Sequence, residues 1–321
     1  MDVAEWCRAC RVLVVAGKGG VGKTTVSAAV AVMAAKAGLD VLVVQLEGRG
    51  GVAGLLGHPE ELSYHEKALW SAVEGPGRSG RVRGRAITPD DALTDYLQSH
   101  GLGKVLYKLM SSGALEVVAT AAPGIRDVLV LGKVRQLEVA AAADLIILDA
   151  PAAGHALTFL SSAAGLADVA RAGPIRAQAT EVAEMLRDAA RCRVLLVTLP
   201  EETPVNEVVE TAAVLREKVG IALGPLVVNC VYPRLEGLDM PVAEAAALAG
   251  ARLVPGHEEC LEQAALFRRG RQQLQAEQLG RLSEALGLRQ LHLPIVFGAQ
   301  ASVERVSQLA EHMAGGLRGL G

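Results

Sequence analysis

The chain has few aromatic residues, no excess of one charge and no long apolar run. Aromatic residues make up 3% of the 321 positions, which leaves few side chains on which nucleic-acid bases could stack. The formal net charge is −3, so no basic field attracts nucleic acid. The longest apolar runs, such as residues 26–35, fall well short of the roughly 20 residues that span a bilayer. These absences argue against a nucleic-acid-binding protein and against a transmembrane segment.

Cysteine is scarce as well. The five cysteines do not have the spacing of a disulfide framework. No apolar core of a secretion signal precedes the first apolar run. We therefore expect a reduced, cytoplasmic protein. Cys7 and Cys10 have the spacing of half a zinc site, but two incidental cysteines are the favoured interpretation.

The most informative feature that is present is a glycine-rich turn. Residues 12–16 have the apolar pattern of a buried strand, and residues 26–37 have that of a helix. The turn between them fits G-x-x-x-x-G-K-[ST], the phosphate-binding loop (P-loop) of nucleoside triphosphatases. Its glycines let successive N–H groups converge on an anion, and the helix start adds further donors. The predicted nucleotide-binding residues here are Gly17, Gly19, Gly20, Val21, Gly22, Lys23, Thr24 and Thr25.

Three of these side chains have distinct predicted roles. Lys23 should neutralise the β- and γ-phosphates, Thr24 should ligate Mg²⁺, and Thr25 should reach the α-phosphate. Asp149 ends another apolar strand, residues 144–149, and should hold the hydration shell of Mg²⁺ opposite Thr24. The alternative for Asp149 is a helix cap for the segment that follows. The cofactors predicted are ATP and Mg²⁺.

Strand and helix patterns alternate along the rest of the chain, which predicts an α/β fold. We expect a three-layer P-loop nucleoside triphosphatase with a mostly parallel sheet, helices on both faces and a helical insertion over about residues 89–142. No linker divides residues 1–321, so one domain is expected. Further strands are predicted at residues 41–46, 194–199, 225–229 and 291–297, and further helices at residues 125–143, 205–219, 258–286 and 302–317.

A second lysine, Lys18, narrows the set of P-loop families that the sequence resembles. The run Gly-Lys-Gly-Gly-Val-Gly-Lys-Thr-Thr resembles the deviant Walker A loop of the ParA, MinD, nitrogenase-iron-protein and ArsA groups. Residues 149–160 resemble switch II of the arsenite-pump (ArsA) ATPase family, which includes the guided-entry ATPases that target tail-anchored membrane proteins. Residues 123–127 also look like a segment of that family. Residues 47–49, Glu-Gly-Arg, look like a bacterial, especially actinobacterial, branch of it.

This resemblance implies roles for three more residues. Lys18 would cross a dimer interface and contact the partner's nucleotide, which would place it, with Asp149, among the catalytic residues. Glu47 aligns with the aspartate that orients the attacking water in the family, so we predict that Glu47 positions water. Asn229 is the predicted adenine contact, because its amide can both donate and accept. The residues that match the positions framing adenine are Pro200, Glu201 and Pro233.

The implied function is that of a dimeric, Mg²⁺-dependent ATPase. It would couple ATP binding and hydrolysis to the handling of a membrane protein or a partner, as a homodimer or as a heterodimer with a related ATPase. A membrane-protein client would bind at the helical insertion, although the insertion carries a single methionine, Met110, and the late Cys-x-x-Cys zinc clamp of guided-entry members is missing. One alternative is a nucleotide-dependent interaction switch with little hydrolysis that pairs with a related ATPase. Another is a ParA- or MinD-like positioning ATPase.

Two surface features allow more than one interpretation. Arg81, Arg83 and Arg85 alternate, as in a basic ridge or, the favoured interpretation, a solvated edge strand. The final helix has an apolar stripe at helical spacing. Its polar face mixes acidic and basic residues, so packing against the domain is favoured over membrane binding.

Overall fold

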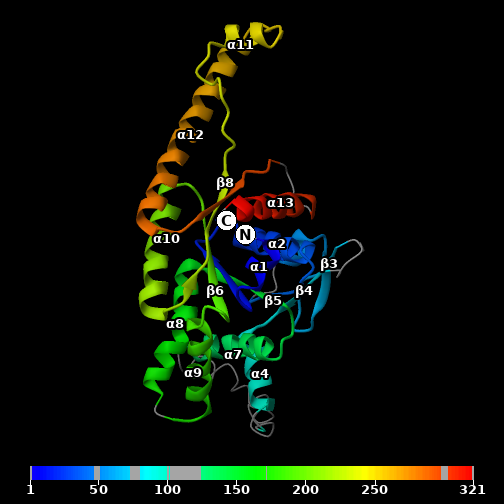
Figure 1. The fold of residues 1–321 in the computed structure, drawn as a ribbon, viewed down its shortest axis with the longest axis vertical. Helices are drawn as coiled ribbons and strands as arrows, with labels where there is room; N and C mark the ends of the chain where they lie inside the picture. Colours follow the sequence, from blue (N-terminus) through cyan, green and yellow to red (C-terminus); the bar gives the residue numbers. More distant parts are fainter. Residues whose placement is uncertain are drawn as a thin grey trace.

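The computed structural model describes residues 2–46, 51–72, 80–99, 101, 124–170, 172–297 and 303–319. One twisted sheet lies at the centre of these residues, and helices cover both of its faces (Figure 1). The described strands run in the order β3-β4-β2-β5-β1-β6-β8-β9, with β7 paired to β6. All neighbours are parallel except β3 and β4. This is the predicted three-layer, mostly parallel α/β fold.

The strands are short and mostly buried. Their bounds are β1 Val12–Gly17, β2 Asp40–Gln45, β3 Lys67–Ser71, β4 Arg81–Ala86, β5 Leu145–Ala152, β6 Cys192–Thr198, β7 Ala222–Leu223, β8 Leu226–Val231 and β9 Gln290–Pro294. Each strand prediction made from the sequence corresponds to one of these elements. The edge strand β3 was not predicted, because its five residues are only partly buried and show no clear alternation.

Alternate residues of the central strands enter two separate cores, one on each face of the sheet. Val12 and Val14 of β1 belong to one core, whereas Leu13 and Val15 belong to the other. This follows from the two-residue period of a strand, which sends successive side chains to opposite faces.

One face is covered by the helix after the P-loop and by the last helix of the chain, which pack against each other. The final helix buries Val306, Leu309, Ala310, Met313 and Leu317, so its apolar stripe packs against the domain as expected. The helices on this face are α1 Val3–Arg8, α2 Lys23–Lys36, α3 Val52–Leu55 and α13 Val303–Gly319.

The other face carries the described part of the predicted helical insertion. Its two described helices, α4 and α7, pack against each other and bury their apolar residues in the core on this face. The rest of the insertion, including Met110, lies outside the described residues. The helices on this face are α4 Pro89–Ser99, α7 Ile125–Val139, α8 Ala153–Val169, α9 Pro174–Arg187 and α10 Glu202–Val214, which continues as the π-helical turn η1 Leu215–Val219.

The three alternating arginines do not lie on an edge strand. Strand β4 lies between β3 and β2, so the edge-strand interpretation was wrong. Arg83 and Arg85 are largely buried and pair with Glu66, while Arg81 and Arg83 both contact Asp40. These arginines are structural ion-pair partners and do not form a basic ridge.

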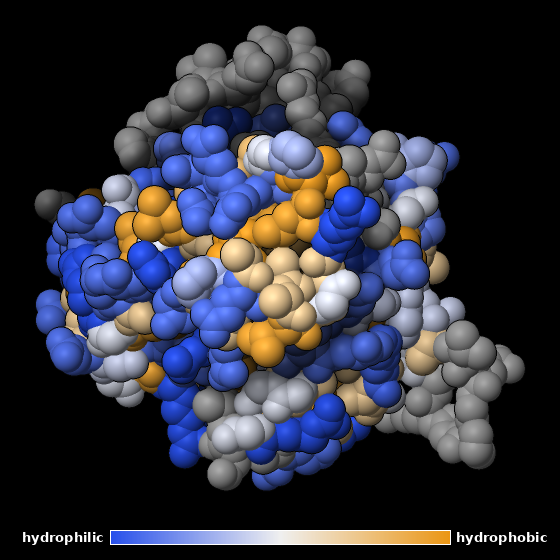
Figure 2. Space-filling view, turned by 90° about the horizontal axis from the view of Figure 1, so that it is seen from above, coloured by the Kyte–Doolittle hydropathy of each residue, from blue (hydrophilic) through white to orange (hydrophobic). Residues whose placement is uncertain are grey.

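A long helical arm, formed by α11 Val242–Leu248 and α12 His257–Leu286, extends away from the sheet (Figure 1). No residue of α11 is buried, and the buried residues of α12 all fall in its second half. Viewed from the end of the molecule where α11 lies, apolar side chains gather among polar ones (Figure 2). The large exposed apolar residues of the arm are Leu248, Val254, Leu261, Leu266, Phe267 and Leu274. Nothing in the described part of the chain forms a helix long and apolar enough to cross a membrane.

Candidate functional site

The glycine-rich turn joins β1 to α2 at the carboxyl edge of the sheet. Gly20 and Gly22 adopt positive φ angles of 85° and 92°, which L side chains rarely adopt. Gly17 lies so close to β6 that an added Cβ would stand 2.2 Å from the carbonyl oxygen of Val197. Helix α2 begins at Lys23 directly after the turn, so its unpaired N–H groups point into the loop. This is the geometry that binds a phosphate.

Asp149 is the centre of a buried hydrogen-bond network beside this loop. Strand β5 pairs with β1, and Asp149 stands opposite Val15, so its carboxylate reaches the start of α2. Thr24 Oγ1 donates to Asp149 Oδ2 at 2.9 Å, and Ser27 Oγ donates to Oδ1 at 3.0 Å. Gln45 Nε2, at the end of β2, donates to Oδ2 at 3.4 Å. The structure therefore brings Asp149 and Thr24 together, as a shared Mg²⁺ site requires.

Burial is the largest influence on the pKa of Asp149 and raises it. The hydrogen bonds from Thr24 and Ser27, the charge of Lys23 and the hydrogen bond from Gln45 act in the opposite direction. The same burial lowers the pKa of Lys23, which the charge of Asp149 partly offsets. Two opposite charges are thus held close together in a partly desolvated site, where they interact strongly with charged ligands.

The oxygen ligands at this place fit a hard cation such as Mg²⁺. Mg²⁺ is usually bound by one or two protein oxygens together with phosphates and waters. Thr24 and Asp149 supply a hydroxyl and a carboxylate of that kind. Within the described ranges, no group of three or more His, Cys, Asp and Glu side chains could hold a metal, so an all-protein cage is not found there.

Lys23 already has a loop contact. Its Nζ donates to the backbone carbonyl of Lys18 at 2.9 Å, so the ammonium group lies across the mouth of the loop. A phosphate bound in the loop would meet this ammonium group and the N–H groups at the start of α2.

Lys18 forms an ion pair within its own chain. Its Nζ forms an ion pair with Glu207 Oε1 of α10 at 2.5 Å, and both side chains are about one-third exposed. The sequence analysis did not identify Glu207, which lies 189 positions from Lys18 and follows no motif. A Lys18 that acted on another subunit would first have to leave this partner.

Asn229 locks the P-loop to β8. Its Nδ2 donates to the carbonyl of Val21 at 2.9 Å, and its side chain is buried. An added Cβ at Gly22 would stand 2.4 Å from this same nitrogen, so the loop needs glycine there. The predicted adenine contact and the phosphate-binding loop are therefore in direct contact.

A cavity of about 200 Å³ opens beside Asn229. It is smaller than the roughly 300–1,000 Å³ of a site that encloses a whole ligand, so it suits the base of a nucleotide whose phosphates lie in the loop. The residues that line it are Gly20, Gly22, Thr25, Leu55, Asn229, Cys230, Pro294, Val296, Arg305, Val306 and Leu309. Pro200, Glu201 and Pro233, expected to frame adenine, do not line this cavity; residues from β9 and α13 do.

The structure describes the positions of all but one of the remaining predicted residues. Gly19 is exposed in the turn, and Val21 is buried beneath it. Thr25 lines the cavity beside Asn229. Glu47 lies outside the described residues. Sequence reasoning missed Ser27, although it lies three residues after Thr24 and hence on the same face of α2, and it missed Gln45, which ends β2 at the same sheet edge.

Cys7, in α1, and Cys10, just after it, are both buried. Burial raises the pKa of Cys7 to about 12 and that of Cys10 to about 11. A thiol with so high a pKa carries little of the thiolate that binds zinc. The two cysteines are core residues, in line with the favoured interpretation.

Comparisons with known proteins agree with this geometry. Residues 12–316 match the model of the CobQ/CobB/MinD/ParA nucleotide binding domain family. The chain is 36% identical to the ATPase BagA of Mycobacterium tuberculosis over 241 residues, which cover 73% of this chain and 69% of that protein. It is 28% identical to an arsenical pump-driving ATPase of Escherichia coli over 207 residues, 64% of this chain and 32% of that protein. The chain therefore belongs to the CobQ/CobB/MinD/ParA nucleotide-binding family, in an ArsA-like branch with the mycobacterial ATPases.

Proposed function

We propose that this chain is a Mg²⁺-dependent ATPase that works as a dimer and couples its nucleotide cycle to a partner protein. The observation that carries the proposal is the contact of Thr24 with Asp149 beside Lys23, at the start of the helix that follows the P-loop. Its relatives are named ATPases, which supports hydrolysis of ATP. Phosphate release from ATP, measured with Mg²⁺ and again with excess EDTA, tests the proposal. Tight ATP binding without phosphate release would instead favour the interaction switch.

Different residues of the site would bind the phosphates and Mg²⁺. Lys23 and the first N–H groups of α2 would hold the β- and γ-phosphates, and Thr24 and Asp149 would hold Mg²⁺. When bound, Mg²⁺ would neutralise charge on the phosphates. Glu47, which follows β2 by two positions in the sequence, is proposed to position the attacking water. The Gln45 side chain donates to Asp149 and accepts from the backbone N–H of Val52. A shift of Val52 would therefore change the hydrogen bond that Asp149 receives from Gln45.

The base of the nucleotide is proposed to be adenine. The Nδ2 of Asn229 donates to the Val21 carbonyl. The opposite orientation of this amide is unfavourable, because it would place Oδ1 against the carbonyl oxygen. Oδ1 is therefore the atom that Asn229 offers to a base. It can accept from the exocyclic amine of adenine, whereas guanine presents an acceptor oxygen at the equivalent position.

Two replacements of Asn229 test its two contacts: aspartate tests the hydrogen bond to the P-loop, and alanine tests the contact with the base. We expect the affinity for ATP to fall by at least about tenfold, because a charged oxygen would then face the Val21 carbonyl. The Asn229→Ala variant should lose its preference for ATP over GTP. Isothermal titration with both nucleotides measures the two effects, and Asn206→Ala, on the exposed face of α10, is the matched control. An unchanged ratio of ATP to GTP affinity in Asn229→Ala would remove Asn229 from the base site.

The partner is proposed to be a second copy of this chain or a related ATPase. Helices α4 and α7 of the insertion bury most of their apolar residues, whereas the arm, with the turn that joins its two helices, exposes six large ones. Exposed large apolar side chains that gather on one element are typical of sites of protein contact. We therefore propose that the arm contacts the partner subunit. We also propose that the insertion handles a membrane-protein client, through the residues between α4 and α7.

Lys18 gives a test of the dimer. If it acts across the interface, Lys18→Ala should lower ATP turnover by at least about tenfold with little change in ATP affinity. Glu207→Gln should release Lys18 and favour the dimer by up to about fivefold per subunit, since a partly exposed ion pair contributes about 0–1 kcal/mol. Light scattering with ATP over a range of protein concentrations measures the dimer, and Glu311→Gln, which breaks the exposed pair with Lys36, is the control. Wild-type turnover in Lys18→Ala would contradict the role across the interface.

A further inference from the structure

The cavity beside Asn229 has one charged residue in an otherwise neutral lining. One of its walls, from the end of β9 and from α13, is apolar except for Arg305. Among the described residues that line the cavity, Arg305 alone carries a charge and none is aromatic. Phe297, three residues after β9, is 71% exposed and packs edge to face against Tyr232 instead. A base in this cavity therefore meets no aromatic ring of the described lining.

Two consecutive residues of β8 face this cavity, which a regular strand does not allow. Asn229 and Cys230 both line it, although successive side chains of a strand point to opposite faces of the sheet. The pairing of β8 with β9 shifts in register between Val228 and Val231, and Cys230 has a positive φ of 58°. A bulge of this kind re-aims side chains at a site. The backbone is thus shaped to bring both residues to the cavity.

Arg305 lies on the side of the cavity where the base is proposed to bind. Burial raises the pKa of the Cys230 thiol, and the charge of Arg305 is the largest influence that lowers it. The guanidinium group therefore lies near Cys230, the neighbour of the proposed base contact Asn229. The phosphates have a cation of their own, Lys23, at the mouth of the P-loop.

Helix stability does not explain an arginine at this position. Arg305 is the third residue of α13, where the partial positive charge of a helix start disfavours a cation. Its half-buried side chain shares a helix face with Leu309, four residues further along, and both line the cavity. A guanidinium group is flat and delocalised, and nucleic-acid bases stack on it as they do on aromatic rings. A ligand with a base therefore explains Arg305 better than the helix does.

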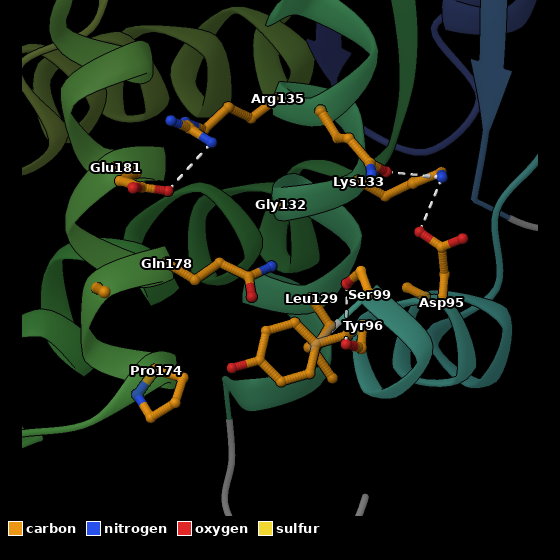
Figure 3. Close-up of a pocket in the computed structure, with 13 residues that line it drawn as sticks. Asp95, Tyr96, Ser99, Leu129, Gly132, Lys133, Arg135, Pro174, Gln178 and Glu181 are labelled. Atoms are coloured by element: carbon orange, nitrogen blue, oxygen red, sulfur yellow. Dashed lines mark hydrogen bonds and ion pairs between the residues drawn. The ribbon is translucent and has the colours of Figure 1, made fainter. Parts of the chain in front are cut away.

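The other large cavity of the described residues offers no such group. It has a volume of about 420 Å³ and lies between α4, α7 and α9 (Figure 3). All four charged side chains that line it are paired, because Lys133 contacts Asp95 at 2.8 Å and Arg135 contacts Glu181 at 3.0 Å. None of the residues assigned to the nucleotide lines it. The base is therefore assigned to the cavity beside the P-loop.

We propose that the guanidinium group of Arg305 stacks on the adenine ring of bound ATP, while Asn229 accepts from the amine at the edge of the same ring. Arg305 thus takes the place of an aromatic side chain in the base site. This role rests on the proposed binding of ATP at the P-loop.

Substitutions that separate the flat shape of Arg305 from its charge test this role. Isothermal titration of the full chain with Mg-ATP should show at least about tenfold weaker binding for Arg305→Ala and Arg305→Lys, because neither offers a flat group. Arg305→Phe should bind Mg-ATP within about threefold of the wild type, because it restores a flat group without the charge. Mg-tripolyphosphate, which has no base, should bind all of these variants as it binds the wild type. Arg318→Ala, an exposed arginine in the last turn of the same helix, is the matched control.

The tripolyphosphate titration also shows that the P-loop of each variant is intact. Recovery of Mg-ATP affinity in Arg305→Lys, failure of Arg305→Phe to recover it, or unchanged affinity in Arg305→Ala would each overturn the stacking role. A loss of tripolyphosphate affinity in Arg305→Ala would do the same, because it would place the guanidinium group on the phosphates. These results leave the proposed ATPase function standing, whereas a wild type that binds neither Mg-ATP nor Mg-tripolyphosphate would overturn both.

Discussion

Replacing Lys23 with alanine is expected to lower ATP turnover by about a hundred- to a thousandfold. Lys23 is the partly buried ammonium group at the mouth of the P-loop, and it would meet the phosphate charge that grows in the transition state. Burial lowers the pKa of Lys23, so its charge is held in the site at a cost to stability. The melting temperature of the nucleotide-free protein should therefore not fall in this variant.

The matched control is Lys36→Ala, at the other end of the same helix, where the ammonium group is exposed and pairs with Glu311. Steady-state phosphate release and thermal unfolding, measured on both variants, provide the comparison. Turnover within a few-fold of the wild type in Lys23→Ala would contradict the role of Lys23 in the mechanism.

Asp149→Asn is expected to produce a comparable loss of turnover, about a hundred- to a thousandfold, and to abolish the response to Mg²⁺. Asparagine keeps the shape of the side chain and one acceptor oxygen, and the hydroxyls of Thr24 and Ser27 can turn to accept from its amide. The hydrogen-bond network therefore survives while the carboxylate is removed. Phosphate release against Mg²⁺ concentration is the measurement, and a normal Mg²⁺ response in this variant would place the metal elsewhere.

The contribution of Asp149 to the stability of the wild type should change with pH in a defined direction, and the same variant lacks this contribution. Burial raises the pKa of Asp149 above its ordinary value of 3.8, so the folded chain binds this proton more tightly than the unfolded chain does. The stability that the protonated group contributes is present below pH 3.8 and is lost as the pH rises through the raised value. Without nucleotide or Mg²⁺, Asp149→Asn should therefore melt no lower than the wild type at neutral pH. A marked fall in its melting temperature would show that the charged carboxylate supports the fold.

What the sequence predicts well here is local. The P-loop, its helix and Asp149, which follows the apolar run of β5, are predicted from neighbouring residues, because turn geometry and helix start are set within a few positions. The topology follows because parallel strands bring their carboxyl ends to one edge. Thr24 and Asp149 could thus be paired across 125 positions from pattern alone.

What the sequence did not predict depends on side chains from distant elements. Glu207 on α10 reaches Lys18 because of how that helix packs, and no spacing encodes this. The wall of the base cavity comes from β9 and α13, whose apolar residues look like any core pattern until their neighbours are known. The arginines of β4 are a third case: alternation predicts a strand but not whether another strand covers it.

The wall that β9 and α13 give to the base cavity has a consequence for synthesis on the ribosome. The P-loop is made early, and its strand and helix can form as the chain emerges. Pro294 and Arg305 are made late, so a nascent chain lacks that wall until translation has passed α13. With the base of ATP in this cavity, as proposed, a chain that has not yet completed β9 and α13 would lack part of the wall around the base.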